Sequence, residues 1–332
     1  MTPLRIVAIG GGTGLSTLLH GLKRYAQEPR EIEITAVVTV SDDGGSSGRL
    51  RRDLDVLPPG DIRNCMVALS EDEALLSKLF QYRFSEGRGL KGHSFGNLFV
   101  TALADITGDF AQAVKVSSEI LASLGRIYPA TAGKVALEAI LGDGTVVRGE
   151  TKISKSRSRI QRIRLVPGQC KPLPETLAAI AEADLITFGP GSLFTSVVPN
   201  LLVDDIPYAI KRSPAIKACF VNLMSQPGET TGFTASDHVI AIHNHAIHDG
   251  AELKLVDVVI VNDRPATTTQ RRKYAVQKAR PILNDIARLK QMDIEVVGAD
   301  LLADGPEVRH DPDRTARIAV ELARRARVPA SV

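Results

Sequence analysis

Apolar runs and amphipathic runs alternate in both the first and the last parts of the chain. Residues 4–10 and 34–40 are apolar and rich in β-branched side chains, which predicts two buried strands. Between them Leu15, Leu18, Leu19 and Leu22 have helical spacing, so the two strands are expected to be parallel. After residue 174 the pattern predicts helices over 175–183, 192–202 and 235–245 and strands over 185–188, 218–223 and 255–261. This alternation predicts an α/β fold with a doubly wound, mainly parallel sheet.

Two segments interrupt the alternation. Four amphipathic stretches, 62–69, 74–84, 95–106 and 110–124, predict a helical insertion over about residues 61–125. Residues 134–141 and 145–150 flank Gly142-Asp143-Gly144, which predicts a hairpin, and a basic stretch ends in an alternating strand over 160–166. The chain closes in an amphipathic helix over 314–327 with Asp311 as its expected N-cap. We therefore expect one domain over 1–332, with the hairpin and basic strand region at about 134–166.

Charge and composition exclude several classes of protein. The 41 Lys and Arg residues against 38 Asp and Glu leave a net charge of +3, too small for a nucleic-acid-coating protein. Cys65, Cys170 and Cys219 lack paired spacing, which favours a reducing cytoplasm. The uncharged stretch 185–203 is broken by glycines and prolines, and the N-terminus lacks a signal-peptide pattern. We expect a cytoplasmic protein without a membrane span, and a homodimer by base rate.

A glycine-rich turn follows the first predicted strand and opens the first predicted helix. It contains Gly11, Gly12, Thr13, Gly14 and Leu15. Glycines let the backbone approach a phosphate, and a helix N-terminus offers free N–H groups and partial positive charge. The spacing is neither G-x-G-x-x-G nor a Walker loop. A phosphate cradle is expected, and a tight turn without a ligand is the alternative.

A second polar segment follows the strand at 34–40. Asp42 is placed to accept hydrogen bonds from a ribose or to hold magnesium beside a diphosphate. Ser46 and Ser47 are candidates for a second anion-binding nest, with Arg49 as a charged clamp. An ordinary surface loop is the alternative.

Five further motifs place polar groups at helix starts or strand ends. Asp61 and Ser94 are expected N-caps, and Asn97 is a candidate ligand contact just after Ser94. A second phosphate-type turn contains Gly189, Gly191 and Ser192. The loop after the strand at 218–223 could touch a sugar or base through Asn222, Gln226 and Thr230, and Arg309 could bring a guanidinium group toward a diphosphate. Capping and ordinary loop polarity are the alternatives.

The histidines do not indicate a metal site. His238, His243, His245 and His248 lack the spacing of a zinc motif and fall on or just past one predicted helix, so a solvated helix face is expected. No metal ligand and no catalytic residue is assigned from the sequence.

The ordered motifs GGGTGLSTLL, VSDDGGSSGRLR, PPGDIRNC, GHSFGNL, GPGSLFTS and NLMSQPGET resemble the gluconeogenesis factor family (YvcK-like), within the superfamily of 2-phospho-L-lactate transferase (CofD-like). The resemblance spans residues 5 to about 311. It implies a Rossmann-like, three-layer α/β/α fold with a helical insertion. It also implies a cytoplasmic regulatory factor that supports cell shape and carbon metabolism during gluconeogenic growth.

The resemblance also implies ligands. Members of the family bind uridine diphosphate N-acetylglucosamine (UDP-GlcNAc), NAD can occupy the same pocket, and an arginine that maps onto Arg309 contributes to nucleotide-sugar binding. No cofactor is expected to be required, a role for magnesium stays open, and an unidentified regulatory protein is a further expected partner. Two alternatives remain: a transferase of a phosphate-linked group like phospholactate, and an NAD-binding oxidoreductase.

Overall fold

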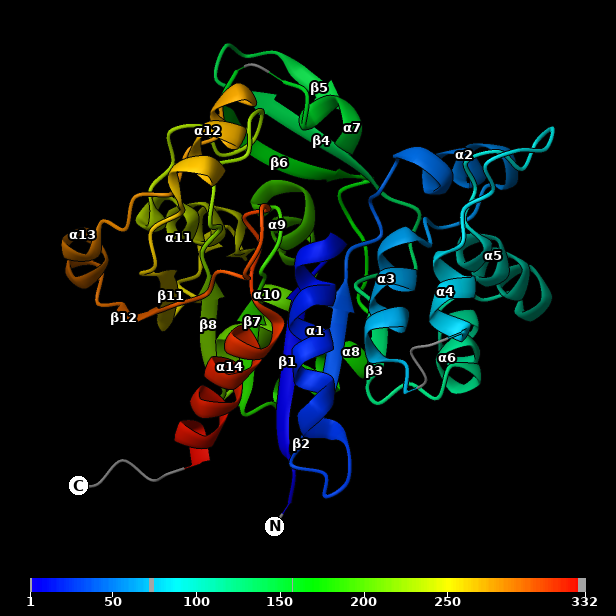
Figure 1. The fold of residues 1–332 in the computed structure, drawn as a ribbon, viewed down its shortest axis with the longest axis horizontal. Helices are drawn as coiled ribbons and strands as arrows, with labels where there is room; N and C mark the ends of the chain where they lie inside the picture. The colour runs from blue at the N-terminus through cyan, green and yellow to red at the C-terminus, as the bar shows by residue number, and fades with distance from the viewer. Residues whose placement is uncertain (1, 72–74, 157, 328–332) are drawn as a thin grey trace.

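The central sheet consists of parallel strands that lie side by side although they are far apart in sequence. The computed structural model describes residues 2–71, 75–156 and 158–327. Within these residues seven strands form the sheet in the order β12-β11-β8-β7-β1-β2-β3 (Figure 1). Every neighbouring pair is parallel. The strands are β1 (Leu4–Gly10), β2 (Ile32–Val38), β3 (Arg126–Pro129), β7 (Leu185–Phe188), β8 (Ile216–Phe220), β11 (Val258–Asn262) and β12 (Glu295–Ala299).

The strand order reverses between β1 and β7. From β1 the chain builds outward through β2 to β3, and it then returns to β7 and builds the other way through β8 and β11 to β12. In open α/β sheets ligands bind outside the carboxyl ends of the strands at such a reversal. The fold therefore places the expected ligand site at the ends of β1 and β7.

Helices cover both faces of the sheet and explain the continuous apolar runs in the strands. On one face lie α1 (Gly12–Ala26), α3 (Gly60–Leu69) and α14 (Pro312–Arg327), and on the other α8 (Pro174–Ala181), α9 (Val198–Leu201) and α10 (Ile206–Arg212) (Figure 1). A Cβ on Gly21 of α1 would collide with the carbonyl group of Pro312, so the small residue lets α14 pack closely on α1. Asp311 accepts a hydrogen bond from Arg314 N–H at 2.9 Å and caps α14 as predicted.

The helices between β2 and β3 begin earlier than the sequence predicts. They are α2 (Gly45–Leu54), α3, α4 (Leu76–Gln81), α5 (Phe95–Thr107) and α6 (Phe110–Ile120). The glycine and serine run with Ser46 and Ser47, expected to form a loop or nest, instead forms the first turn of α2. Ser94 caps α5 as predicted, accepting from Asn97 N–H at 3.2 Å. Of the predicted stretch 74–84, residue 74 lies outside the described residues.

A small antiparallel sheet lies over the carboxyl ends of the central strands (Figure 1). It consists of β4 (Ala136–Leu141), β5 (Val146–Arg148) and β6 (Ile160–Val166), with the predicted hairpin between β4 and β5, and α7 (Glu150–Ile153) follows it. The remaining elements are a π-helical turn (Leu193–Val197), α11 (Ala235–His245), β9 (Ile247–His248), β10 (Ala251–Glu252), α12 (Thr268–Val276) and α13 (Ile286–Gln291).

The prediction of a solvated histidine face on α11 is wrong. His238 and His245 are only 2% and 4% exposed. The His245 ring bonds the Ala241 carbonyl through Nδ1 at 2.7 Å, and its Nε2 accepts from Ile163 N–H of β6 at 2.9 Å. The small sheet therefore covers this helix face, which the spacing of the histidines along the helix does not reveal.

Among the helices of the described residues, none combines the length and the hydrophobicity of a membrane-spanning segment. The three cysteines are free thiols buried in the protein.

Candidate functional site

Two glycine turns meet at the reversal of strand order. The first follows β1 and includes Gly12 and Gly14, and the second follows β7 and includes Gly191. A Cβ on Gly14 would lie 2.7 Å from the backbone nitrogen of Gly191, so the two turns pack backbone against backbone. Gly12 has a φ of +63°, a left-handed conformation that favours glycine. The glycines thus permit both the turn and the close approach.

A cavity of about 330 Å³ opens beside these turns, within the size range of small-molecule sites. Its wall combines both glycine turns with the loop after β8, the end of α12 and the segment before α14. The wall-lining residues that the sequence predicted are Gly11, Gly12, Thr13, Gly14, Gly191, Ser192, Asn222, Gln226 and Arg309. Residues separated by almost 300 positions therefore share one cavity.

Amide side chains connect the loop after β8 to the second glycine turn. Gln226 Nε2 donates to Ser192 Oγ at 2.8 Å, and Asn222 Nδ2 donates to Gln226 Oε1 at 3.3 Å. The Gln226 backbone N–H also donates to Thr230 Oγ1 at 2.9 Å. Thr230 therefore orients the loop, while Asn222, Gln226 and Ser192 present polar groups at the cavity wall.

Asp61 does not cap its own helix as predicted. Pro59 occupies the N-cap position of α3, and Asp61 lies in the first turn. Its carboxyl group lies against Gly11, and it accepts a hydrogen bond from the Gly12 N–H. A buried carboxyl thus satisfies one donor at the start of α1, whose first turn still offers further N–H groups. Burial, followed by the nearby charge of Asp42, raises the pKa of Asp61 to about 7.

Several carboxyl groups surround the beginning of α1. Burial, followed by repulsion from Asp42 and Asp61, raises the pKa of Glu150 to about 9. Burial also raises the pKa of Asp42 and of Glu229. Glu229 Oε1 accepts from Thr195 Oγ1 at 3.1 Å. Within the described residues, no three His, Cys, Asp or Glu side chains are grouped closely enough to hold a metal ion by themselves.

The predicted residues of the helical insertion form a network outside the cavity wall. Asp42 accepts from Gly44 N–H at 2.8 Å and also bonds Ser47. Asn97 Nδ2 donates to Ser47 Oγ at 3.4 Å, and Ser46 Oγ lies 3.0 Å from His93 Nδ1. These serines and Asn97 are buried because they join the starts of α2 and α5.

Three other predicted residues are also placed away from the cavity wall. Arg49 donates to the Lys91 carbonyl at 2.8 Å, within the helical insertion. Leu15 has a fully buried side chain in the core under α1. Gly189, with a φ of +75°, lies behind the second turn and packs near Val197 and Phe220.

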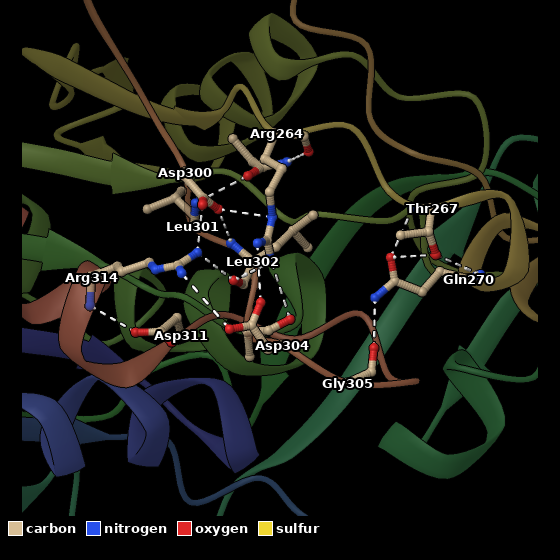
Figure 2. Close-up of polar contacts among 12 residues, drawn as sticks. Arg264, Thr267, Gln270, Asp300, Leu301, Leu302, Asp304, Gly305, Asp311 and Arg314 are labelled. Carbon is tan, nitrogen blue, oxygen red and sulfur yellow. Dashed lines mark hydrogen bonds and ion pairs between the residues drawn. The ribbon is translucent and has the colours of Figure 1, made fainter.

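The segment that carries Arg309 is held by a network of charged groups (Figure 2). Arg264 binds both Asp300 and Asp304 at 3.1 Å and donates to the Leu302 carbonyl at 2.6 Å. Arg314 binds the other Asp300 oxygen at 2.5 Å. On the other side of the segment, Gln270 Nε2 donates to the Gly305 carbonyl at 3.0 Å. This clamp holds the turn between residues 302 and 310 against the cavity.

The wall also contains residues that the sequence analysis does not predict, among them Tyr274, Gln277 and His310. Tyr274 accepts from Val308 N–H at 3.0 Å, so it both fixes the Arg309 segment and borders the cavity. Burial lowers the pKa of His310 to about 4, which keeps its ring neutral at pH 7. Tyr274 lies on a polar helix with no glycine motif beside it, so no local signal marks it.

Comparison with known proteins assigns the family. A family model described as 2-phospho-L-lactate transferase CofD matches residues 6–302. A protein named gluconeogenesis factor from Halalkalibacterium halodurans is 46% identical over 322 residues, covering 97% of each chain. A protein of the same name from Bacillus subtilis is 46% identical over 319 residues, covering 96% of this chain and 98% of the relative.

A solved structure agrees with this assignment. The crystal structure of a Bacillus halodurans protein superposes with a TM-score of 0.91 at 45% identity, covering 96% of this chain and 100% of that one. The same fold thus accompanies the sequence similarity along nearly the whole chain. The chain belongs to the CofD family and, within it, to the group of proteins named gluconeogenesis factor.

Proposed function

We propose that this protein is a cytoplasmic regulatory factor that binds UDP-GlcNAc in the cavity between the two glycine turns. In this role it would support cell shape and carbon metabolism during gluconeogenic growth, through a protein partner that senses the bound state. The names of the relatives support the metabolic part of the proposal. The cavity beside the two glycine turns supports a diphosphate-containing nucleotide as the ligand.

The observation that carries the proposal is the meeting of two glycine turns at the start of α1. Backbone N–H groups and the helix dipole favour a diphosphate there. Along the same wall, Asn222 and Gln226 offer amide groups for a uridine, and Tyr274 offers an aromatic ring. Arg309 adds a positive charge to the same wall, where it can approach the phosphates.

Gly12→Asp tests the position of the diphosphate. The new carboxylate would repel phosphate at the turn, so calorimetry should detect micromolar UDP-GlcNAc binding, about −8 kcal/mol, in the wild type and none in the variant. The substitution also strains the backbone because Gly12 has a positive φ. Gly232→Asp is the matched control, since Gly232 has a φ of +76° and open space around it. Wild-type affinity in Gly12→Asp would contradict the proposal, and titration with NAD in parallel would identify the preferred nucleotide.

The carboxyl groups around α1 favour a second candidate, a magnesium-assisted transferase of a phosphate-linked group. A diphosphate beside Asp42 and Asp61 would be repelled unless a cation lay between them. Magnesium is usually bound through one or two carboxylates together with substrate phosphates. Asp42 and Asp61 fit that pattern: they would supply two carboxylates, and the phosphate oxygens of the ligand would supply further oxygen atoms to the ion. When bound, magnesium would neutralise charge on the leaving diphosphate.

Asp42→Asn distinguishes a magnesium ligand from a ribose contact. As a magnesium ligand, Asp42 should matter only when magnesium is present. As a ribose contact, its replacement should weaken binding equally in magnesium and in EDTA, by about 1.5–3 kcal/mol for lost charged hydrogen bonds. Calorimetry in the two buffers measures the difference, and normal binding in both would reject both roles.

Product analysis separates the binder from the transferase. UDP-GlcNAc should be recovered unchanged after long incubation with magnesium and the protein. His93→Ala should alter only affinity or stability, because His93 bonds Ser46 within the buried insertion network. Chromatographic detection of free UDP, in proportion to protein and lost in His93→Ala, would favour the transferase.

A further inference from the structure

A second and larger hollow adjoins the nucleotide cavity. It has a volume of about 660 Å³ and lies between α1, α3 and α4, and Arg309 and Pro312 also line it. Thr13, Thr17 and Arg309 line both spaces. A molecule in this groove would therefore lie directly beside a nucleotide bound at the glycine turns.

Two arginines, Arg63 and Arg309, line the groove. Arg63 of α3 lines it, and the Arg63 Nη2 donates to its neighbour Asn64 at 2.6 Å. The Arg63 Nε is buried with no hydrogen-bond partner among the described residues. Asp61 and Asp42 offset part of the Arg63 charge, but burial and the like charge of Arg83 lower its pKa. A guanidinium in such surroundings favours an added anion.

Arg309 supplies the second guanidinium group to the groove wall. The two arginines come from α3 and from the clamped segment before α14, and Thr13 lies at the same groove wall. Guanidinium groups bind carboxylates and phosphates with paired hydrogen bonds. A neutral sugar would bring no negative charge to these two guanidinium groups.

We infer that this groove is a subsite for a second small molecule, which presents a carboxylate or phosphate to Arg63 and Arg309 beside the bound nucleotide. The inference deepens the proposed function and rests on it, because it makes the protein respond to two ligands together. Arg309, shared by the two spaces, would then couple them: because both anions draw on the same positive charge, each ligand should weaken the binding of the other.

The test isolates the groove from the glycine turns. Inorganic phosphate is titrated by calorimetry into Gly12→Asp protein, where the turn is blocked, and into wild-type protein saturated with UDP. Acetate, titrated in the same way, shows whether a carboxylate suffices. Saturable phosphate or acetate binding is expected in both proteins, with at least about a tenfold loss of affinity after Arg63→Met.

Methionine is chosen because the Arg63 side-chain stem packs against the start of α5, where a Cβ on Gly96 would lie 2.9 Å from Arg63 Cδ. Arg88→Met, at an exposed position of the same insertion, is the matched control and should bind both anions normally. Arg63→Met should keep wild-type affinity for UDP, and a melting curve should show that it is folded.

The result that overturns the inference is anion binding that Arg63→Met leaves unchanged, or no anion binding in either protein. The proposed function fails separately. If the wild type does not bind UDP while Arg63-dependent phosphate binding persists in Gly12→Asp, the nucleotide assignment is wrong and the groove remains an anion site.

Discussion

A single carboxyl group at the start of α1 links proton binding to the glycine turn. Asp61 accepts from the Gly12 N–H, and its pKa is raised to about 7, first by burial and then by Asp42. Near neutral pH the group therefore changes between a neutral form, which tolerates a phosphate nearby, and a charged form, which repels it. Nucleotide affinity should fall as the pH rises from 6 to 8, unless magnesium compensates the charge.

Asp61→Asn gives the matching prediction for stability. The folded-state pKa of Asp61 is raised above the ordinary value of 3.8, so the folded wild type loses stability as the pH rises from about 4 through 7. The variant, which carries no titrating group there, should be more stable than the wild type at pH 8, by up to about 4 kcal/mol. The advantage should disappear near pH 4. Urea unfolding of both proteins at pH 4 and pH 8 measures the difference in their free energies of unfolding. The same difference at the two pH values would contradict the role of Asp61.

At the scale of elements, the segment before α14 shows how charged groups outside the cavity position a residue in its wall. Arg264 joins Asp300, Asp304 and the Leu302 carbonyl, and thereby fixes the turn that presents Arg309 (Figure 2). Exposed ion pairs contribute little on their own, but a network with a backbone carbonyl holds a loop in one geometry.

Arg264→Met should therefore weaken UDP-GlcNAc binding without removing any cavity contact. The expected loss is about 1 kcal/mol, because the freed segment must be ordered again when the ligand binds. Calorimetry measures the loss. Arg271→Met on the exposed face of α12 is the control, and identical affinities of the two variants would show that the network does not position Arg309.

In the molecule as a whole, the proposed ligand contacts both halves of the sheet. The first turn ends β1, and the second ends β7 at the point where the strand order reverses. A nucleotide that contacts both turns binds the folded protein and not the unfolded chain, in which the two turns are apart. UDP-GlcNAc at about 100 times its Kd should therefore stabilise the protein by about 2.7 kcal/mol.

Denaturant unfolding with and without UDP-GlcNAc tests this stabilisation. The ligand-dependent increase in the free energy of unfolding should be absent in Gly12→Asp and present in Gly232→Asp, because only the substitution at Gly12 blocks the turn. Equal stabilisation of both variants would place the ligand elsewhere in the molecule.

The local units can be predicted from the order of residues alone: the strand β1, its glycine turn and α1, the caps Ser94 and Asp311, and the hairpin at Gly142–Gly144. The order of the motifs also predicts the family. Each depends on neighbouring residues, whose spacing and backbone freedom are visible along the chain. Short or exposed elements such as β3, β12 and α2 were missed because their apolar patterns are too brief or their composition suits loops.

The folded arrangement determines which of these units meet. It paired the turn after β1 with the turn after β7, brought Asp61 to Gly12 and Tyr274 to the cavity, and withdrew Ser46, Ser47 and Asn97 into the insertion network. Local patterns indicate which apolar side chains are buried, but not which strand lies beside which. That choice is made by packing between segments more than a hundred residues apart, and the site follows from it.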